Sequence, residues 1–469
     1  MRKPFFEKTG KGIDMNKCKV FVPYGGLGMG ISDESFHRAI AMKPDIIATD
    51  AGSTDSGPYY LGNGTCKYAR EAIKTDTKRM IVAAHELHIP ITIGSCGTCG
   101  VDDGVDFMEE ICREICLEEG ISVKVAKIYS ELSRETVYEK LVSGKIKPLE
   151  PAWELDKETI SKCSHIVGVL GAEPFMKALE EGADIVLAGR TTDTAVLACM
   201  PLLKGCSPAA AWHGAKVCEC SGTCTTSPQS GGIILTVDEN GFEVESPAED
   251  SSCTTFTVSA HLLYENADSL HLVEPGVVVD VSEADYIQLP DGRVRVENTR
   301  IRKTPYTMKL EGSGPSGYQT MTLVGIRNRI VLEDPVGWLA KLSAHADRKL
   351  EALGYDPDTY SYSLRPYGYN AVYGGDVPKG YIPNELGLLL TVTADNQETA
   401  TRIAKVFNPI LLHFEVAKNT PKPSFAFPFS PAEVEKGKIY EFRLNHVVEL
   451  DDPFELIRME YVTICGKEE

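Results

Sequence analysis

Short apolar segments alternate with amphipathic ones through the first part of the chain. Six β-rich runs lie between residue 18 and about residue 200: CKVFVPY, DIIATD, ITIGS, SVKVAKIY, HIVGVL and ADIVLAG. Between them, segments such as YAREAIKTDTKRMIVAAHELH and VDFMEEICREICLEEG repeat apolar residues at helical spacing. Strands that alternate with helices predict an α/β fold with a doubly wound, mainly parallel sheet.

The pattern changes after residue 228. GGIILTVDENGFEVES and GVVVDVSEADYIQLPDGRVRVENTRI indicate antiparallel strands with turns at DENG and LPDGR. GWLAKLSAHADRKLEALG and NQETATRIAKVFNPILLHFEVA have the spacing of helices. A chain of 469 residues is long for one core. We therefore expect an α/β domain over 1–228 and an α+β domain over 229–469 that completes the cleft.

Every Gly-rich segment of the first part follows a predicted strand. In chain order these segments are GGLGMG, DAGSTDSG, GSCGTCG, GAEP and GRTTDTA. Ligands of parallel sheets bind at the carboxyl ends of the strands. We therefore expect all five segments to lie around one ligand-binding cleft at this edge of the sheet.

The strongest site candidate is DAGSTDSG. Asp50 ends the strand, and Asp55 follows in a turn where Ser53 and Thr54 offer hydroxyls. A carboxylate beside amides and hydroxyls can hold a hydroxylated ligand, accept a proton or bind a divalent cation. A helix cap uses the same residue types, but one small turn hardly needs two aspartates. We predict that both aspartates are catalytic and that Ser53 and Thr54 bind substrate.

Two further loops supply expected substrate-binding residues. In GRTTDTA, the planar guanidinium of Arg190 suits a carboxylate or phosphate, and Thr192 and Asp193 follow it. The alternative is a local ion pair between Arg190 and Asp193. In GGLGMG, the amides of Gly26 and Gly28 could hold an anion, or the glycines could simply form a tight turn.

The segment AWHGAKVCECSG places four reactive side chains close together. His213 is a candidate general acid or base, and Glu219 is a second carboxyl. Cys220 becomes a nucleophile if a cation such as Lys216 lowers its pKa. An amphipathic helix with a hydrogen-bonded histidine is the alternative. We expect His213 and Glu219 to be catalytic.

Two later segments carry polar residues that could line the opposite wall of the cleft. Lys309 and Glu311 share one face of the predicted strand in YTMKLEGSG, and AHLLYENADSLHLVEPG contributes His261 and Glu274. Strands expose such groups routinely, so exposure on a sheet surface is the alternative.

The cysteines raise the question of a metal. SCGTCG and CECSGTC could supply thiolates to zinc or to an iron–sulfur cluster from Cys96, Cys99, Cys218, Cys220 and Cys224. The second group is irregularly spaced, and cysteines are also common small core residues. We assign no firm metal ligand, expect no iron–sulfur cluster and leave a divalent cation open. Fourteen cysteines in a chain of this length also fit free thiols in a reducing cytoplasm.

Charge and hydropathy exclude some partners. A net charge of -19 disfavours nucleic acid and anionic membranes, whose phosphates it would repel. No segment approaches the roughly 18 uninterrupted apolar residues of a membrane helix. The first residues contain no sustained apolar stretch, so we expect no signal peptide and place the protein in the cytoplasm.

An ordered set of motifs resembles a known family. DIIATDAGSTDSGPYYLGNG, IPITIGSCGTCG, ADIVLAGRTTDTAVLACMPLLKG, AAAWHGAKVCECSG, AHLLYENADSLHLVEPG and YTMKLEGSG occur in this order over most of residues 20–330. Together they resemble the acyclic terpene utilisation (AtuA-like) family, found beside acyl-CoA and hydroxy-acid catabolic genes. The resemblance implies small-acid catabolism but no settled active site. Cys96 and Cys99 replace the Ala or Gly typical of relatives, so any role for them would belong to a subgroup.

These observations favour an enzyme of small-acid catabolism, a lyase of the hydratase or dehydratase type. Its substrate would be a hydroxy- or oxo-carboxylate or the CoA thioester. Arg190 would hold the carboxylate, Asp50 or Asp55 the hydroxyl or a divalent ion, and His213 or Glu219 would move the proton.

Two other interpretations stay open. One is a non-catalytic subunit that binds acyl-CoA or an organic acid and is completed by a small partner protein. The other is an enzyme that depends on thiols or on an iron–sulfur cluster. Enzymes of this size and class often form dimers or larger assemblies, so we expect a homo-oligomer.

Overall fold

The structure is a computed structural model that describes residues 16–263, 266 and 268–466. The predicted absence of a signal peptide falls largely on residues 1–15, outside the described part. The chain forms two compact units, Met1–Gly314 with Phe442–Glu469, and Pro315–Glu441. No helix in the described part is both long enough and apolar enough to cross a membrane.

The first unit is built on a ten-stranded mixed sheet. Its centre is parallel and consists, in spatial order, of β1 (Cys18–Val22), β2 (Ile46–Asp50), β3 (Ile91–Gly94), β7 (Ile185–Ala188) and β4 (Val123–Tyr129). Antiparallel strands flank it: β8 (Ile233–Val237), β9 (Gly241–Glu245), β13 (Val294–Glu297) and β12 (Asp285–Gln288) beside β1, and β19 (Arg458–Ile464) beside β4. The central strands are apolar and almost wholly buried, which is typical of parallel strands covered on both faces.

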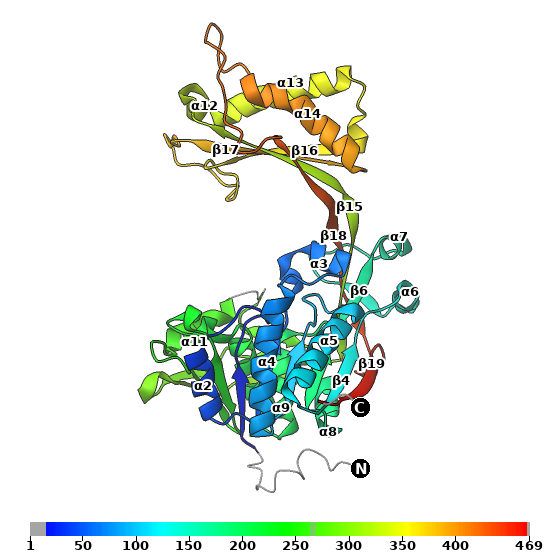
Figure 1. The fold of residues 1–469 in the computed structure, drawn as a ribbon, viewed down its shortest axis with the longest axis vertical. Coiled ribbons are helices and arrows are strands. Elements are labelled where there is room, and N and C mark those ends of the chain that lie inside the picture. The colour runs from blue at the N-terminus through cyan, green and yellow to red at the C-terminus, as the bar shows by residue number, and fades with distance from the viewer. Residues whose placement is uncertain (1–15, 264–265, 267, 467–469) are drawn as a thin grey trace. The chain divides into compact units, whose positions relative to one another are not determined.

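Alternate residues of the central strands point into two different cores. Val20 and Ile46 belong to the core that includes residues of α8 (Glu173–Glu180), α9 (Asp193–Leu203) and α10 (Pro208–Cys218). Phe21 and Ile47 belong to the core that includes residues of α2 (Asp33–Ala41), α4 (Arg70–Leu87) and α5 (Asp102–Glu119) (Figure 1). The predicted mixed α/β class is confirmed, while the doubly wound course of the chain stays a prediction.

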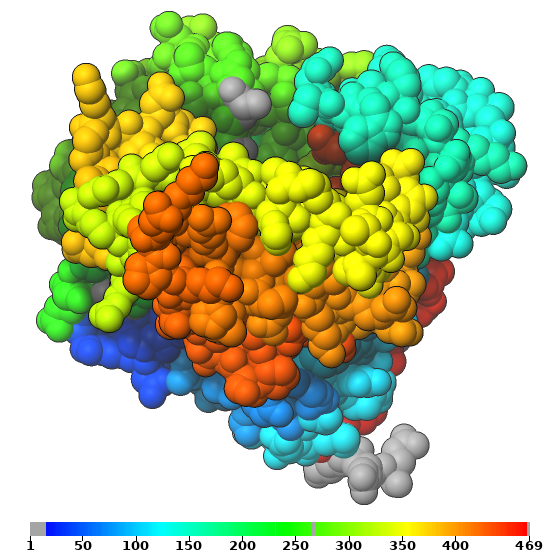
Figure 2. All heavy atoms as spheres, turned by 90° about the horizontal axis from the view of Figure 1, so that it is seen from above, coloured from blue at the N-terminus to red at the C-terminus, as the bar shows by residue number. Residues whose placement is uncertain are grey.

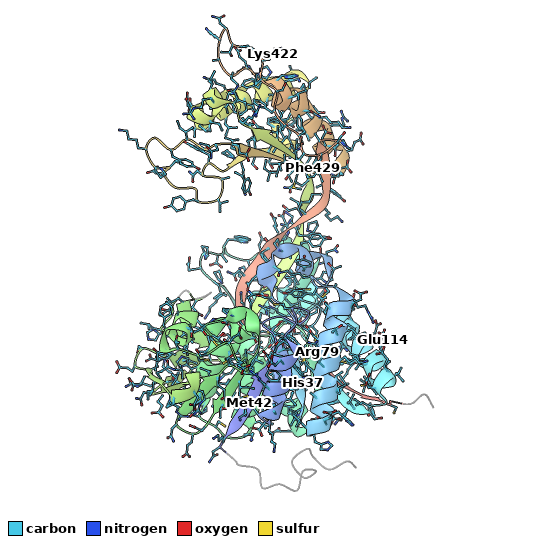
Figure 3. The ribbon with its side chains drawn as sticks, turned by 60° about the vertical axis from the view of Figure 1, so that its left-hand side comes forward. His37, Met42, Arg79, Glu114, Lys422 and Phe429 are labelled. Carbon is cyan, nitrogen blue, oxygen red and sulfur yellow. The ribbon has the colours of Figure 1, made fainter. Side chains whose placement is uncertain are left out.

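Ion pairs connect α4 to both neighbouring helices. Arg79 of α4 donates to Asp33 Oδ1 of α2 at 2.5 Å, and Glu114 of α5 accepts from Arg70 and Lys74 of α4 (Figure 3). These side chains are partly exposed, so each pair contributes little free energy. The apolar cores therefore set the positions of the helices.

Shorter elements complete the first unit. The helices are α3 (Pro58–Asn63), α6 (Arg134–Val142), α7 (Lys157–Ser161) and α11 (Thr255–Ala260). A small antiparallel sheet consists of β10 (His271–Glu274), β11 (Val277–Asp280) and β14 (Arg300–Lys303). β5 (Ile146–Pro148) pairs with the end of β18 (Glu433–Glu449), and β6 (His165–Val169) pairs with the start of β15 (Thr307–Ile326).

The second unit has its own sheet and core. The sheet order is β16 (Tyr360–Tyr367), β17 (Leu386–Ala394), the later part of β15 and the early part of β18. The helices are α12 (Arg329–Glu333), α13 (Pro335–Ala352) and α14 (Gln397–His413), of which α13 (yellow) and α14 (orange) lie side by side in Figure 2. Every second residue of β17 is buried against these helices, which is typical of a sheet with one covered face.

The division into units differs from the predicted boundary at residue 228. The sheet of the first unit continues beyond β1 with β8, β9, β13 and β12, and these strands do not form a separate sheet. β19, close to the end of the chain, also pairs with β4. Residues 229–469 are consequently divided between the two units.

Candidate functional site

Asp50 and Ser95 meet where two parallel strands end. Asp50 is the last residue of β2 and is 3% exposed. Its Oδ1 accepts a hydrogen bond from the Gly52 amide at 2.8 Å, and its Oδ2 accepts one from Ser95 Oγ at 3.2 Å. Ser95 follows β3 and has a φ of 44°, a left-handed conformation that is uncommon outside glycine. Such backbone outliers cluster at functional sites, so we take Asp50 and Ser95 as the first residues of a candidate site.

Arg190, two residues after β7, joins this corner to the next loop. Its Nη1 donates to Ser95 Oγ at 3.1 Å, to the Thr191 carbonyl at 2.7 Å and to Asp193 Oδ1 at 3.3 Å. Its Nε donates to Glu311 Oε2 at 3.0 Å. The sequence left two roles open for Arg190, binding of a substrate carboxylate and a local ion pair with Asp193. These contacts show the ion pair with Asp193 and a second one with Glu311.

Glu311 of β15 holds the opposite side of Arg190. Its Oε2 also accepts from Thr54 Oγ1 at 3.0 Å, and its Oε1 pairs with Lys309 Nζ at 2.9 Å. Burial alone would raise the pKa of Glu311, but Arg190 and Lys309 outweigh it and hold the pKa at about 2. Glu311 is therefore ionised at neutral pH.

Asp50 has the opposite pKa shift. Burial and the neighbouring Asp193 carboxylate raise the pKa of Asp50 well above its usual range, against the effects of Arg190 and the Gly52 amide. The Asp193 side chain is 24% exposed, and a second carboxylate at this distance disfavours the charged form of Asp50. One hydrogen-bonded network thus contains a carboxyl with a raised pKa, Asp50, and one with a lowered pKa, Glu311.

A second group of charges adjoins Asp193. Lys216 Nζ of α10 lies 2.5 Å from Glu219 Oε1, and Glu219 is 4% exposed. Burial, with Asp193 and Glu274 adding, raises the pKa of Glu219 to about 8 despite Lys216. Glu274 of β10 accepts from Thr194 Oγ1 at 2.8 Å, and burial raises its pKa to about 7. The Asp193 carboxylate acts on both groups, so they form one cluster.

Close backbone packing fixes the loops around this cluster. A Cβ at Gly94, the last residue of β3, would collide with Thr191 and Val196. A Cβ at Gly100 would overlap the backbone of Arg190. The loops after β3 and β7 interlock at these two glycines, and this places Ser95 beside Arg190.

The loop after β2 contributes Thr54 to the site but not Ser53 or Asp55. Thr54 donates to Glu311, as described above. Asp55 is exposed, and its contacts are with Ser53, whose Oγ donates to Asp55 Oδ2 at 2.6 Å and accepts from the Asp55 amide at 3.1 Å. Ser53 and Asp55 thus form a local capping turn, which was the alternative to a substrate site in this loop. The structure does not bring them to Asp50, Arg190 and Glu311.

Thr192 and the first glycine loop make structural contacts. Thr192 caps α9 by accepting from the Ala195 amide at 3.2 Å. The amides of Gly28 and Gly30 donate to Asp76 Oδ2 at 2.9 and 3.1 Å. A carboxylate of the protein therefore takes the place of the anion predicted at Gly28, while the Gly26 carbonyl accepts from the Met29 amide at 3.2 Å, as in a tight turn.

His213 is held by neutral groups. Its Nδ1 lies 2.7 Å from Thr299 Oγ1 and its Nε2 lies 3.1 Å from the Tyr286 hydroxyl, with the ring against Phe242. Burial lowers the pKa of His213 to about 3. The sequence offered two roles for His213, a general acid or base and a hydrogen-bonded structural histidine. These contacts are those of the structural histidine.

Thr299 also lines a polar surface hollow of about 390 Å³. This hollow shares no residue with the carboxyl network.

The five candidate thiolate ligands do not converge on one point. Cys96 is fully buried, and the Cys99 thiol contacts the Tyr60 carbonyl at 3.5 Å, where burial raises the pKa of Cys99 to about 11. Among the described residues, the one group of three or more side chains that could hold a metal is Glu219, Cys220 and His261. Of the five cysteines, Cys220 alone belongs to it.

Sequence reasoning missed three residues of the site. Ser95 lies in GSCGTCG, where the cysteines drew attention, and Thr194 ends the hydroxyl run of GRTTDTA. Tyr68 lies close to Gly26, and burial, Cys66 and Asp50 together raise its pKa. A serine after a predicted strand was a usable signal, whereas nothing in the sequence marks Tyr68.

Comparisons with known proteins identify a family. No curated protein and no solved structure matches the chain. The family model described as acyclic terpene utilisation family protein AtuA matches residues 68–419, well over half of the chain. That description places the family in the utilisation of acyclic terpenes, a catabolic role. The chain belongs to the acyclic terpene utilisation family.

Proposed function

We propose that the chain is a catabolic enzyme whose active site is the carboxyl network at the strand ends. The reaction is the addition or removal of water on a hydroxy- or oxo-carboxylate, free or as its CoA thioester. The observation that carries this proposal is the buried Asp50 beside the partly exposed Asp193, an arrangement in which burial and the second carboxylate raise the pKa of Asp50. Dehydration needs an acid for the departing hydroxyl and a base for the proton on carbon, which two such carboxyls can supply.

The other charged groups position these two acids and the substrate. Arg190 is enclosed by Ser95, Asp193 and Glu311, so its role is to orient Asp193 and to balance the charge of the carboxyls. The Lys309 side chain is 42% exposed while still paired to Glu311. Lys309 is therefore the cation that we assign to the carboxylate of the substrate or to a phosphate of CoA, in place of Arg190.

We place this enzyme in the cytoplasm. The supporting observation is that the fourteen cysteines form no disulfide and that most of them are buried, as expected for a protein of a reducing compartment.

A ligand screen tests the proposal. Thermal unfolding is measured with hydroxy acids, enoates and their CoA esters, and each stabilising ligand is then assayed for gain or loss of water. A true ligand at 100 times its dissociation constant should add about 2.7 kcal/mol to the free energy of unfolding. If no carboxylate or thioester stabilises the protein, the proposal fails. Stabilisation without turnover, restored by a small partner protein, would instead favour the non-catalytic subunit.

A further inference from the structure

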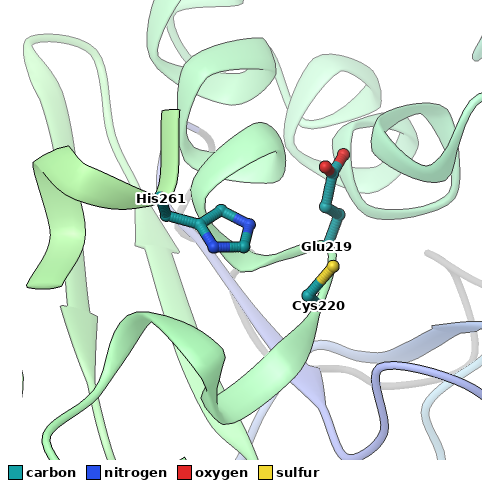
Figure 4. Close-up of side chains that lie close together, drawn as sticks. All are labelled: Glu219, Cys220 and His261. Atoms are coloured by element: carbon teal, nitrogen blue, oxygen red, sulfur yellow. The ribbon is translucent and has the colours of Figure 1, made fainter. Parts of the chain in front are cut away.

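Three potential metal ligands converge beside the carboxyl network. Glu219 follows α10, Cys220 is the next residue, and His261 begins η4 (His261–Leu263). One ligand atom from each lies within 4.8 Å of the other two. Figure 4 shows the imidazole of His261 facing the side chains of Glu219 and Cys220. Atoms bound to one tetrahedral zinc ion at about 2.0–2.3 Å lie about 3.3–3.8 Å apart, so side-chain movements of about 1 Å close the site.

Glu219 is a buried carboxyl with a partner on one oxygen. It is 4% exposed, and Lys216 Nζ lies 2.5 Å from its Oε1. Buried charges are stable when they are paired or bind a metal. A divalent cation at the other oxygen would be a second partner of this kind.

An unsatisfied oxygen of Glu274 points to the same place. Glu274 Oε1 accepts from Thr194, but its buried Oε2 has no hydrogen-bond partner among the described residues. The Glu274 carboxylate acts on Glu219 from outside the group of three side chains that approach one another within 4.8 Å. A buried polar atom without a partner calls for an explanation, and a bound ion is one of the established ones.

We propose that Glu219, Cys220 and His261 bind one zinc-class divalent cation, with Glu274 as the carboxylate beside it. Lys216 binds Glu219 through Oε1, so Oε2 is the oxygen assigned to the ion. His261 Nδ1 lies 3.4 Å from Thr223 Oγ1, and metal-binding histidines typically make such a contact with the second ring nitrogen.

The ligand types select the class of metal. A thiolate with an imidazole and a carboxylate suits zinc, whereas magnesium and calcium prefer oxygen ligands alone. Three protein ligands also leave one coordination position open, as in catalytic rather than structural zinc sites. This inference does not rest on the proposed reaction, because its test measures metal binding alone.

The test is equilibrium dialysis of the chelator-treated full chain against Zn²⁺, together with the absorption spectrum of its Co²⁺ complex. We expect one ion per chain and a thiolate-to-cobalt charge-transfer band. Cys220→Ser should abolish the band, and His261→Asn should weaken binding at least about tenfold. The matched controls are Cys465→Ser, at an exposed thiol, and His271→Asn, at an exposed histidine paired with Asp268. Both controls should bind as the unmodified chain does.

Three results would overturn the site. They are no saturable binding of Zn²⁺ or Co²⁺, a charge-transfer band that survives Cys220→Ser, and controls that lose as much affinity as the site variants. Circular dichroism of each metal-free variant separates loss of folding from loss of a ligand. If Cys220→Ser does not fold, His261→Asn decides the question through its affinity. A chain that binds zinc but no carboxylate would contradict the proposed function and leave the metal site standing.

Discussion

Arg190 places a guanidinium in the protein interior, where its charge is tolerated only because carboxylates surround it. Glu311 is 5% exposed in its side chain and is the closer of the two carboxylates that pair with Arg190. Removing one partner of a buried ion pair leaves an uncompensated charge, which is far more costly than breaking a pair on the surface.

We therefore expect Glu311→Gln to lower the free energy of unfolding by about 3 kcal/mol. The control is Glu34→Gln, which breaks the exposed pair with Arg38 on α2 and should cost at most about 0.5 kcal/mol. Urea unfolding of both variants measures the difference. Equal effects of the two substitutions would contradict the assignment of Arg190 to a buried network.

His213 gives a prediction about pH. Burial lowers its pKa in the folded protein to about 3, below the ordinary value of about 6.5 expected in the unfolded chain. The unfolded state then binds more protons between these values, so His213 costs stability as the pH falls from 6.5 towards 3. The slope is at most about 1.4 kcal/mol per pH unit.

Comparing the unmodified chain with His213→Gln isolates this effect, because glutamine does not titrate. Denaturant unfolding between pH 7 and pH 4 should show the unmodified chain losing stability relative to the variant as the pH falls. Parallel curves would mean that burial does not hold His213 neutral.

Single residues also show where sequence reasoning succeeds. Strand ends in a parallel sheet share an edge, so the sequence was enough to place Asp50, Arg190 and Asp193 together. It could not separate Asp50 from Asp55, because the direction of each side chain depends on the turn η1 (Thr54–Ser56). The partners of His213 lie 73 and 86 residues away in the sequence, beyond the reach of local patterns.

At the scale of elements, glycine allows the end of β3 to pack closely against Thr191 and against Val196 of α9. Gly94→Ala should destabilise the protein by about 1–3 kcal/mol, because the new methyl group collides with Thr191 and Val196 in a packed core. Gly325→Ala in β15 is the control, since a Cβ there makes only ordinary contacts at 3.6 Å and beyond. Thermal unfolding compares them, and an unchanged midpoint for Gly94→Ala would refute the interlocked loops.

The elements themselves were largely readable from the sequence, but their pairing was not. The segments ITIGS and ADIVLAG became β3 and β7, and VDFMEEICREICLEEG became most of α5. The antiparallel register of β1 with β8 and the crossing of β15 from one unit to the other depend on long-range pairing. A period of two in apolar residues predicts a strand but not its neighbours.

At the scale of the whole molecule, the network lies entirely in the first unit. Gly314 and Phe442 bound the second unit, and Arg443 approaches Gly314 closely, so a short linker can join the two ends. The second unit has its own core. A chain in which such a linker replaces residues 315–441 should fold and bind the same ligands.

Circular dichroism and the ligand screen measure both properties of the shortened chain. A folded but non-binding product would show that the second unit contributes to the site. The isolated residues 315–441 should also unfold cooperatively, and a chain without a transition would contradict the independence of that core.

The central claim is that Asp50 and its partners form the active site. It is tested most directly by turnover of a stabilising ligand in Asp50→Asn and Asp55→Asn, two substitutions of the same kind in one loop. The account predicts that Asp50→Asn lowers kcat at least about 100-fold while Asp55→Asn, at an exposed residue outside the network, leaves it nearly unchanged. Turnover that survives in Asp50→Asn and is lost in Asp55→Asn would contradict it.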